Sequence, residues 1–423
     1  MDHLALHGAR WGDHRSVSPR PADVPHRQRR SSRGDLGREP SATNRGAIPL
    51  TGASRPLRIL HIIAHVSPER RYGGPNTVAI TQSLALARAG HEVTLVAGSE
   101  GYPLGTQHID GVTAQLFRSV PVGPGTFAFR RAPGMRRWLA AHSDEFDIAH
   151  VHLSRDLVTP GAARALRIAS VIQPHGMLTS PAPGAAKRLI DAIWLRPIFA
   201  HAGASISVNE DELRDLRRAL PVTRGRLLPN SVLAANSSKP EEPRVPPTVL
   251  FLARLHPVKR VDLFVEAAEM LVDSGADLRF IVVGPDEGQG ALVRSAVQRL
   301  RGRLRYAGSA TAAQAADFMA RADLYAMPSD SESFGMTMLE ALAHGTPVVA
   351  RRHLPLGEEL ASLGAARAFN GTARDLADVI RGALEDLPFR RTIARLGPRI
   401  VADRWGTAET ALKLEAIYRE VLE

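Results

Sequence analysis

The stretch Ser331-Glu-Ser-Phe-Gly-Met-Thr-Met-Leu-Glu340-Ala-Leu-Ala-His-Gly-Thr-Pro-Val-Val-Ala350 carries the strongest structural signal in the sequence. It predicts a helix from about Met336 to His344, with Gly345 as its C-terminal stop and Pro347 at the start of the next element. A Phe-Gly turn opens this helix, and a carboxylate lies on either side of the turn. The pattern therefore predicts a helix whose first turn lies beside two acidic groups.

One of these carboxylates has an unusual place on the predicted helix. Met336, Leu339 and Ala343 have the spacing of a core-facing stripe, and Glu340 falls on the same stripe. A charge that points inward is costly unless a polar group meets it. We therefore expect a ligand beside Glu340, with Glu332 on the other side of the turn.

Outward from this stretch, strands alternate with helices in two similar halves. Short links between strands and helices predict parallel sheets with helices on both faces. Residues 234–247, which are polar and contain four prolines, separate the halves. The sequence thus predicts two doubly wound α/β domains, Rossmann-like, whose ligands bind beyond the strand ends in a cleft. The predicted strands span 58–66, 92–97, 147–153, 170–173 and 204–208, then 248–253, 278–284, 304–307 and 324–327.

Length and composition exclude several classes of protein. The 423 residues suggest two domains, and the absence of cysteine excludes disulfides and thiolate metal sites. No apolar run approaches the ~20 residues of a membrane span, and the N-terminus lacks the apolar core of a signal peptide. We expect a cytoplasmic protein that at most contacts the inner face of the plasma membrane peripherally.

The N-terminal segment differs from the rest of the chain. Residues 1–55 hold 10 arginines against 5 acidic residues, which supplies +5 of the net charge of +11. The segment is rich in Pro, Ser, Gly and His without apolar periodicity, so we predict disorder. Such a tail can bind nucleic acid or anionic lipid. The alternative that we favour is a dispensable extension or an over-long translated start.

Two groups of residues at predicted strand ends carry weak signals. Gly73 and Gly74 would let backbone amides approach a ligand at a helix N-terminus, although Gly-Gly-Pro is more often only a turn. His175 directly follows a predicted strand, but a lone histidine is more often structural than catalytic.

Two further groups carry stronger signals. Arg254 and Lys259 bracket a strand-to-helix turn, where an arginine can bind a phosphate in a bidentate way and a lysine adds a point charge. Cations at a helix N-terminus are unfavourable without an anion, which argues against a merely solvated turn. Lys259 is one of only four lysines among 54 basic residues. Near the opening stretch, backbone amides can meet a phosphate while Glu332 and Glu340 accept hydrogen bonds from diols. Such a cleft suits a nucleotide-sugar.

At these residues the sequence resembles the retaining glycosyltransferases of family 4, which have the two-domain GT-B fold. The resemblance covers about residues 56–420. It rests on the Glu-x7-Glu pair with its context, on Arg254-Leu-x3-Lys259, and on three short motifs in the family's order: Gly73-Gly74-Pro75, His175-Gly176-Met177 and Pro229-Asn230.

The resemblance implies a role for each matching residue. Arg254 and Lys259 would bind the donor diphosphate and offset charge on the leaving group. Glu340 would hold the ribose hydroxyls, Glu332 would contact the transferred sugar, and His175 would lie near that sugar and the acceptor hydroxyl. The expected catalytic residues are thus Glu332, Arg254, Lys259 and His175, and the expected substrate-binding residues are Gly73, Gly74, Phe334, Gly335, Met336 and Glu340.

The family's mechanism needs no protein nucleophile, metal or cofactor, because a donor phosphate oxygen takes the proton of the incoming hydroxyl. The absence of an Asp-x-Asp motif agrees with a metal-free site. The resemblance divides the chain into a tail 1–54, an acceptor domain 55–225, a donor domain 226–400 and a C-terminal helix 401–423 that packs back on the acceptor domain.

We expect transfer of a sugar from a nucleoside diphosphate-sugar to a glycan or lipid-linked acceptor, in cell-envelope or exopolysaccharide biosynthesis. One alternative is a GT-B epimerase or phosphorylase, although a phosphorylase needs a late pyridoxal-binding lysine and only Lys413 is available. Another is a non-catalytic nucleotide- or polyanion-binding protein; a nucleic-acid partner is not favoured.

Two further motifs receive structural interpretations. His150 and His152 could form a metal pair, but the sequence places no third ligand beside them. Phe127 to Trp138 mixes aromatics with four arginines and could contact a membrane. Pro133 interrupts any amphipathic helix there, so a solvated helix end is the favoured interpretation.

Overall fold

The computed structural model describes residues 55–68, 74–109, 111–123, 129–178, 191–233, 235, 239 and 245–423. The predicted tail 1–54 and the predicted site residue Gly73 lie outside these residues, as does Phe127.

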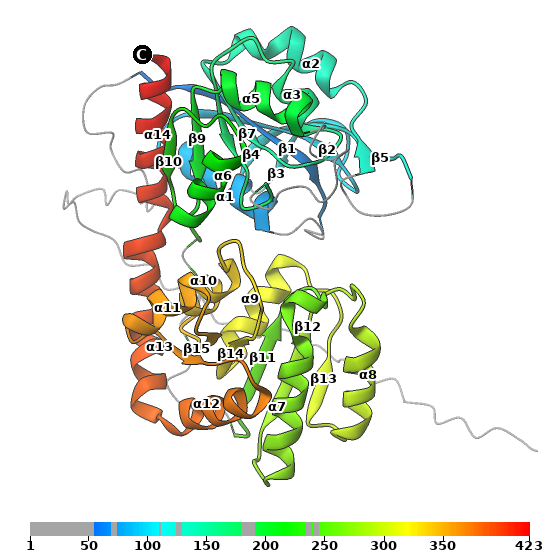
Figure 1. Cartoon of the computed structure of the whole chain (residues 1–423), viewed down its shortest axis with the longest axis vertical. Helices are drawn as coiled ribbons and strands as arrows, with labels where there is room; N and C mark the ends of the chain where they lie inside the picture. Colours follow the sequence, from blue (N-terminus) through cyan, green and yellow to red (C-terminus); the bar gives the residue numbers. More distant parts are fainter. Residues whose placement is uncertain are drawn as a thin grey trace, which may run out of the picture. The chain divides into compact units, whose positions relative to one another are not determined.

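The first sheet contains the strands of the first half of the chain (Figure 1). Its order is β10-β9-β8-β7-β1-β2-β4-β3, and all neighbours are parallel except the β3–β4 hairpin. The strands are β1 Arg58–Val66, β2 Glu92–Ser99, β3 Gly105–Ile109, β4 Val112–Arg118, β7 Ile148–His152, β8 Ser170–Gln173, β9 Ala204–Ser207 and β10 Gly225–Leu227. Their helices are α1 Gly74–Arg88, α2 Met135–His142, α3 Thr159–Ala163, α5 Arg196–His201 and α6 Glu210–Ala219, and β5 Val120–Pro121 pairs with β6 Arg130–Arg131.

The second sheet is parallel throughout, in the order β13-β12-β11-β14-β15-β16. Its strands are β11 Thr248–Leu252, β12 Arg279–Val283, β13 Leu304–Tyr306, β14 Leu324–Met327, β15 Val348–Arg351 and β16 Ala366–Phe369. Its helices are α7 Val261–Asp273, α8 Gly290–Arg299, α9 Ala312–Arg321, α10 Met336–Ala343, α11 Pro355–Ser362, α12 Ala373–Glu385 and α13 Leu387–Trp405, and α14 Thr407–Leu422 follows.

The expected fold class is confirmed, because both halves are doubly wound sheets whose strands are parallel apart from the β3–β4 hairpin. The predicted strands occur within two residues of their expected limits. β3 and β4 were not predicted, since 99–137 offered no motif that we could interpret. The first sheet extends to β10, which ends at Leu227, two residues beyond the expected limit of the first domain.

Alternation along β1 builds two cores, one on each face of the first sheet. Ile59 and Ile63 pack in the layer that contains side chains of α1 and α14, whereas Leu60 and Ile62 pack with those of α2, α3, α5 and α6. A central parallel strand buried on both faces is expected to be almost wholly apolar. His61, in the middle of β1, is therefore an exception, because it places a buried polar ring in this core.

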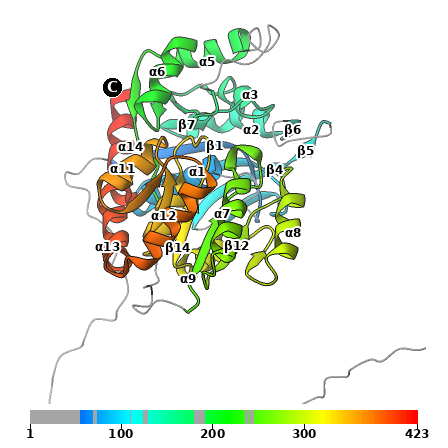
Figure 2. The same cartoon turned by 60° about the horizontal axis from the view of Figure 1, so that its bottom comes forward.

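The two C-terminal helices belong to different cores (Figures 1 and 2). Phe389, Ile393 and Trp405 of α13 pack with the second sheet, while Leu414 and Tyr418 of α14 pack with the first. The segment 401–423, predicted as one helix, thus begins inside α13 and becomes α14 after Gly406. The helix α14 thus completes a core of the first sheet.

Strand order reverses near the middle of each sheet. The chain passes from β1 to β2 on one side and later returns to β7 on the other side of β1, and β11 lies between β12 and β14 in the same way. At such reversal points the loops after adjacent strands diverge and leave a crevice beyond the carboxyl ends. The fold therefore provides one crevice in each half.

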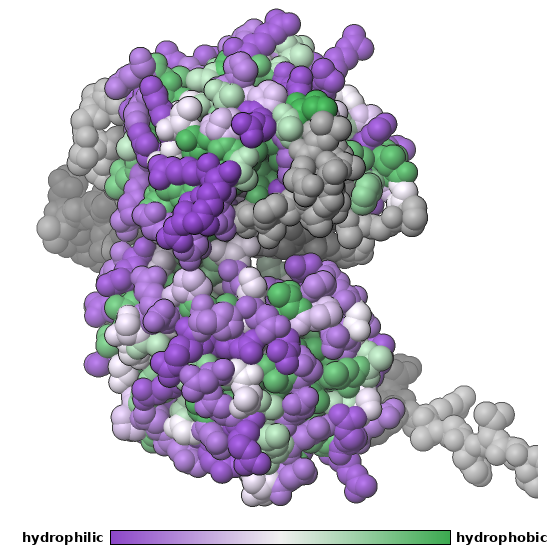
Figure 3. All heavy atoms as spheres, viewed as in Figure 1, coloured by the Kyte–Doolittle hydropathy of each residue, from purple (hydrophilic) through white to green (hydrophobic). Residues whose placement is uncertain are grey.

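In the view of Figure 3, hydrophilic side chains cover most of the visible surface over the second sheet, and hydrophobic side chains form small groups. Among the described residues, no helix is both long and apolar enough to cross a membrane.

Candidate functional site

A single cavity of about 830 Å³ is lined by residues at the carboxyl ends of strands in both sheets, beside the points where the strand order reverses. His65 near the end of β1 and His152 at the end of β7 line it from the first sheet. Arg254 just after β11 and Met327 at the end of β14 line it from the second. Among the predicted site residues, the cavity is lined by Gly74, His175, Arg254, Lys259, Glu332, Phe334, Gly335 and Met336.

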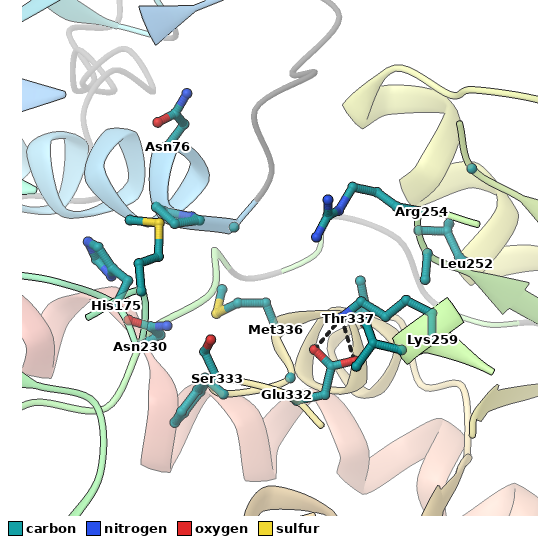
Figure 4. Close-up of a pocket in the computed structure, with 18 of the residues that line it drawn as sticks. Asn76, His175, Asn230, Leu252, Arg254, Lys259, Glu332, Ser333, Met336 and Thr337 are labelled. Atoms are coloured by element: carbon teal, nitrogen blue, oxygen red, sulfur yellow. Dashed lines mark hydrogen bonds and ion pairs between the residues drawn. The ribbon is translucent and has the colours of Figure 1, made fainter. Parts of the chain in front are cut away.

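Two of the predicted charged residues form an ion pair with each other (Figure 4). Lys259 ends a 3₁₀ turn between β11 and α7, and Glu332 lies in the loop between β14 and α10. The Lys259 Nζ donates to Oε2 and Oε1 of Glu332 at 2.7 and 2.8 Å, and the two side chains are only 15% and 11% exposed. Removing either partner of such a pair would leave a charge with little access to water.

Arg254 is paired differently. Its Nη1 lies 2.8 Å from a carboxylate oxygen of Glu287, and about half of the arginine side chain is exposed. This pair is open to solvent, so it costs little to separate and the guanidinium can turn to another anion.

The N-terminus of α10 faces the cavity with Phe334, Gly335 and Met336. Gly335 has φ +95°, a backbone conformation that residues with a side chain rarely adopt, so glycine suits the position. Gly335, the residue before the helix, has no side chain with which to cap this end. Its first amides and the positive end of the helix dipole are therefore suited to an anion.

The predicted helix and most of its core-facing stripe are confirmed. Leu339 and Ala343 are buried in the core, whereas Met336 is only partly buried and both packs against the core and lines the cavity. Glu340, one turn after Met336 and on the same face, is only half-buried. It is not among the residues that line the cavity. The burial cost inferred from the sequence for this carboxylate is therefore smaller than expected.

His175 lies in the turn that follows β8, in a constrained backbone. Its φ is +55°, and the amide of the next residue, Gly176, donates to the buried Glu212 carboxylate. Glu212 also accepts from the amide of Val208 at 2.7 Å. A Cβ on Gly176 would lie 2.7 Å from the side chain of Ser333, so this loop touches the loop that carries Glu332.

The imidazole of His175 is a neutral group. Burial lowers its pKa to about 3. At physiological pH it can therefore donate one hydrogen bond and accept another, but it adds no positive charge to the cavity.

Comparison with known proteins agrees with this arrangement. The family model described as Glycosyltransferase Family 4 matches residues 72–233, and that described as Glycosyl transferases group 1 matches residues 246–386. The chain belongs to the family 4 glycosyltransferases. The two matches fall one on each sheet.

The relatives and structural neighbours of this glycosyltransferase cover most of its length. It is 28% identical over 424 residues to a D-inositol 3-phosphate glycosyltransferase of Kineococcus radiotolerans, which covers 86% of this chain and 96% of the relative. It is 26% identical over 355 residues to a phosphatidyl-myo-inositol mannosyltransferase of Mycolicibacterium smegmatis, covering 80% and 89%. Sucrose-phosphate synthase of Thermosynechococcus elongatus has a TM-score of 0.65 at 19% identity, covering 86% and 99%. HepE of Anabaena, solved with UDP and glucose, has a TM-score of 0.64 at 19% identity, covering 85% and 98%. The glycosyltransferase has the GT-B fold.

Several residues that line the cavity of the glycosyltransferase had no predicted role. Asn230 is 5% exposed, and its Oδ1 has no partner among the described residues. Asn76 at the start of α1 donates to the His65 carbonyl, and Thr337 accepts from the Tyr325 hydroxyl at 2.8 Å. Only Asn230 had a sequence signal, as part of the Pro-Asn motif.

The sequence could not place a third histidine beside His150 and His152, and the structure brings His61 there, because His61 is directly paired with His150 across β1 and β7. The rings of His150 and His152 are nonetheless nearly parallel, at 16° with centroids 4.4 Å apart. The lone pairs of the ring nitrogens lie in the ring planes, so in two nearly parallel rings they do not converge on one point. Tetrahedral coordination of a metal would require them to converge. The histidines of the glycosyltransferase are arranged to bond to one another.

Proposed function

We propose that this glycosyltransferase moves a sugar from a nucleoside diphosphate-sugar to a glycan or lipid-linked acceptor, with retention and without a metal or cofactor. Its expected setting is cell-envelope or exopolysaccharide biosynthesis on the cytoplasmic side, with a peripheral membrane contact if the acceptor is lipid-linked. The observation that carries the proposal is the Lys259–Glu332 pair beside Arg254 and the α10 N-terminus in one cavity. HepE, solved with UDP and glucose, supports a nucleotide donor.

The acceptor class has separate support. The relatives are named for D-inositol 3-phosphate and for phosphatidyl-myo-inositol. These names favour a polyol phosphate or a lipid that carries one, within the broader class of glycan and lipid-linked acceptors.

In the proposed reaction, the donor diphosphate becomes the counter-ion of Lys259 and Arg254, which offset the charge that develops on the leaving group. Glu332, released from Lys259, accepts a hydrogen bond from the transferred sugar, and Glu340 accepts from the ribose. The acceptor oxygen bonds to the anomeric carbon on the face from which the diphosphate departs. The bond from that carbon to the diphosphate oxygen breaks, and the acceptor proton passes to a donor phosphate oxygen.

The phosphorylase alternative loses support from the position of its lysine. Lys413 lies on α14, half exposed, and pairs with Glu409 at 2.8 Å. Among the described lysines only Lys259 lines the cavity.

Transfer and hydrolysis of labelled nucleotide-sugars by Lys259→Ala and Glu340→Ala test the proposal, with Lys413→Ala as the lysine control. We expect Lys259→Ala to lose about 10²–10³-fold in kcat, as removal of one group that stabilises developing charge does. Wild-type turnover in both site variants would overturn the site assignment. The anomeric coupling constant of the product, measured by NMR, tests retention, and conversion of the donor sugar without acceptor would indicate an epimerase instead.

A further inference from the structure

A chain of hydrogen-bonded side chains leads from α14 through the first core to the cavity. The Tyr418 hydroxyl lies 3.2 Å from Nε2 of His61, and Nδ1 of His61 lies 3.1 Å from Nε2 of His152. Nδ1 of His152 then lies 2.7 Å from Nε2 of His175. All four side chains are buried. We call these residues the histidine relay.

The pleat of the sheet and the strand register bring the relay together. His61 lies between Ile59 and Ile63 on β1, so it faces the layer that contains α14. His152 lies two residues after His150, the residue paired with His61, and so shares that face. Tyr418 projects from α14 onto the same face. Together with His150, the relay places five polar rings in or beside one core. Burying these rings would be costly if they did not form hydrogen bonds with one another.

Counting protons shows that the relay has two states. A hydrogen bond between two neutral imidazoles uses one proton, and each neutral ring has only one N–H. The Tyr418 hydroxyl also lies 2.7 Å from Nδ1 of His150, so it donates to His150 or to His61 and accepts from the other.

If Tyr418 donates to His61, His61 donates to His152, His152 donates to Nε2 of His175, and the proton of His175 is on Nδ1. If Tyr418 donates to His150, every bond reverses and Nδ1 of His175 is bare. Nδ1 of His175 has no partner among the described residues, which leaves it for a ligand.

We propose that His61, His152 and Tyr418 are positioning residues that couple the tautomer of His175 to the direction in which the Tyr418 hydroxyl donates, so that α14 influences whether His175 donates or accepts a hydrogen bond in the cavity. The consequence for catalysis rests on the proposed function, but the coupling itself does not. Since His175 lies beside the expected sugar and acceptor, a changed tautomer ratio would leave more of the enzyme with the wrong hydrogen bond there.

The full-length protein with ¹⁵N-labelled histidine provides the test, with the His175 signals assigned from a His175→Gln sample. We expect the ring nitrogen shifts of His175 to report a different tautomer ratio in Tyr418→Phe than in the wild type, because the variant removes the hydroxyl that links His61 to His150. That variant should also lose about fivefold to tenfold in kcat, the effect of one hydrogen bond, while the KM for the donor stays within about twofold. Ile417→Val, the neighbouring core position on α14, controls for packing.

An unchanged His175 tautomer in Tyr418→Phe, or an equal loss of kcat in Ile417→Val, would overturn the proposal. If Tyr418→Phe does not fold, His61→Gln interrupts the relay at the next position and is also expected to change the tautomer ratio of His175. His152→Gln, which keeps a donor and an acceptor, should retain more kcat than His152→Leu. If the proposed reaction itself is wrong, the activity assays fail for every variant while the NMR result still decides the tautomer.

Discussion

The two sides of the cavity are built from opposite kinds of polar group. On the second-sheet side, Lys259, Glu332 and Arg254 are charged and held in ion pairs. On the first-sheet side, His152 and His175 are neutral, buried and bonded to each other. Fixed charges can bind a diphosphate, whereas neutral rings orient hydroxyls without attracting the anion. The difference indicates that one half supplies the binding charge and the other sets hydrogen-bond direction.

The charged side should be the more sensitive. Glu332→Ala is expected to lower the free energy of unfolding by about 1–3 kcal/mol, because it leaves the partly buried Lys259 without its counter-ion. A nucleoside diphosphate such as UDP should then stabilise the variant more than it stabilises the wild type, because its phosphates replace the lost carboxylate. Urea unfolding with and without UDP measures both effects. Glu409→Ala, which removes the exposed partner of Lys413, is the control, and equal stabilisation of Glu332→Ala and wild type by UDP would contradict the prediction.

The neutral side should respond to pH instead. Burial lowers the pKa of His61 and His175 to about 3, and lowers those of His150 and His152 well below the ordinary value of 6.5. Below pH 6.5 the unfolded chain binds a proton at each ring and the folded protein does not. The free energy of unfolding should therefore fall as the pH falls from 6.5 towards 3, by up to about 1.4 kcal/mol per pH unit for each ring.

Urea unfolding between pH 7.5 and 5.5 measures this slope in a range where carboxylates titrate little. His61→Gln removes one of the titrating rings and should reduce the slope accordingly. A free energy of unfolding that stays constant over this range would show that the rings take up protons in the folded protein too.

The smallest effect is expected where the two sides touch. Gly176→Ala should lower stability by about 1–2 kcal/mol through its positive φ, and should also raise the KM for the donor because its Cβ meets Ser333. Gly364→Ala has a similar positive φ of +67° and no atom near its Cβ, so it controls for backbone strain alone. Adding Ser333→Gly should restore the KM and leave the strain. A KM for Gly176→Ala equal to that of Gly364→Ala would mean that the contact between the loops has no effect on donor binding.

The grouping of Arg254, Lys259 and Glu332 could be predicted from the sequence, because parallel strands place their carboxyl ends at one edge. The orientation of Glu340 could not, since helical spacing shows which residues share a face but not where that face points. β3 and β4 had a usable signal in the Asp110-Gly111 dipeptide between them, which is typical of a hairpin.

The histidines were harder to interpret than the charged residues. His175 looked isolated because its neighbours in space come from β1, β7 and α14. Their meeting depends on strand register and on a helix from the far end of the chain, neither of which periodicity specifies.

The late position of α14 in the sequence also determines how long part of the first sheet stays uncovered during synthesis on the ribosome. Tyr418 follows His61 by 357 residues, so a nascent chain must expose the α14-facing layer of its first sheet until the last helix has been made. The second sheet's core draws on residues up to Trp405, directly before α14, but its strands are made later and therefore wait for a shorter time. A chaperone that binds exposed apolar surface would therefore find its longest-lived target on the domain that is translated first.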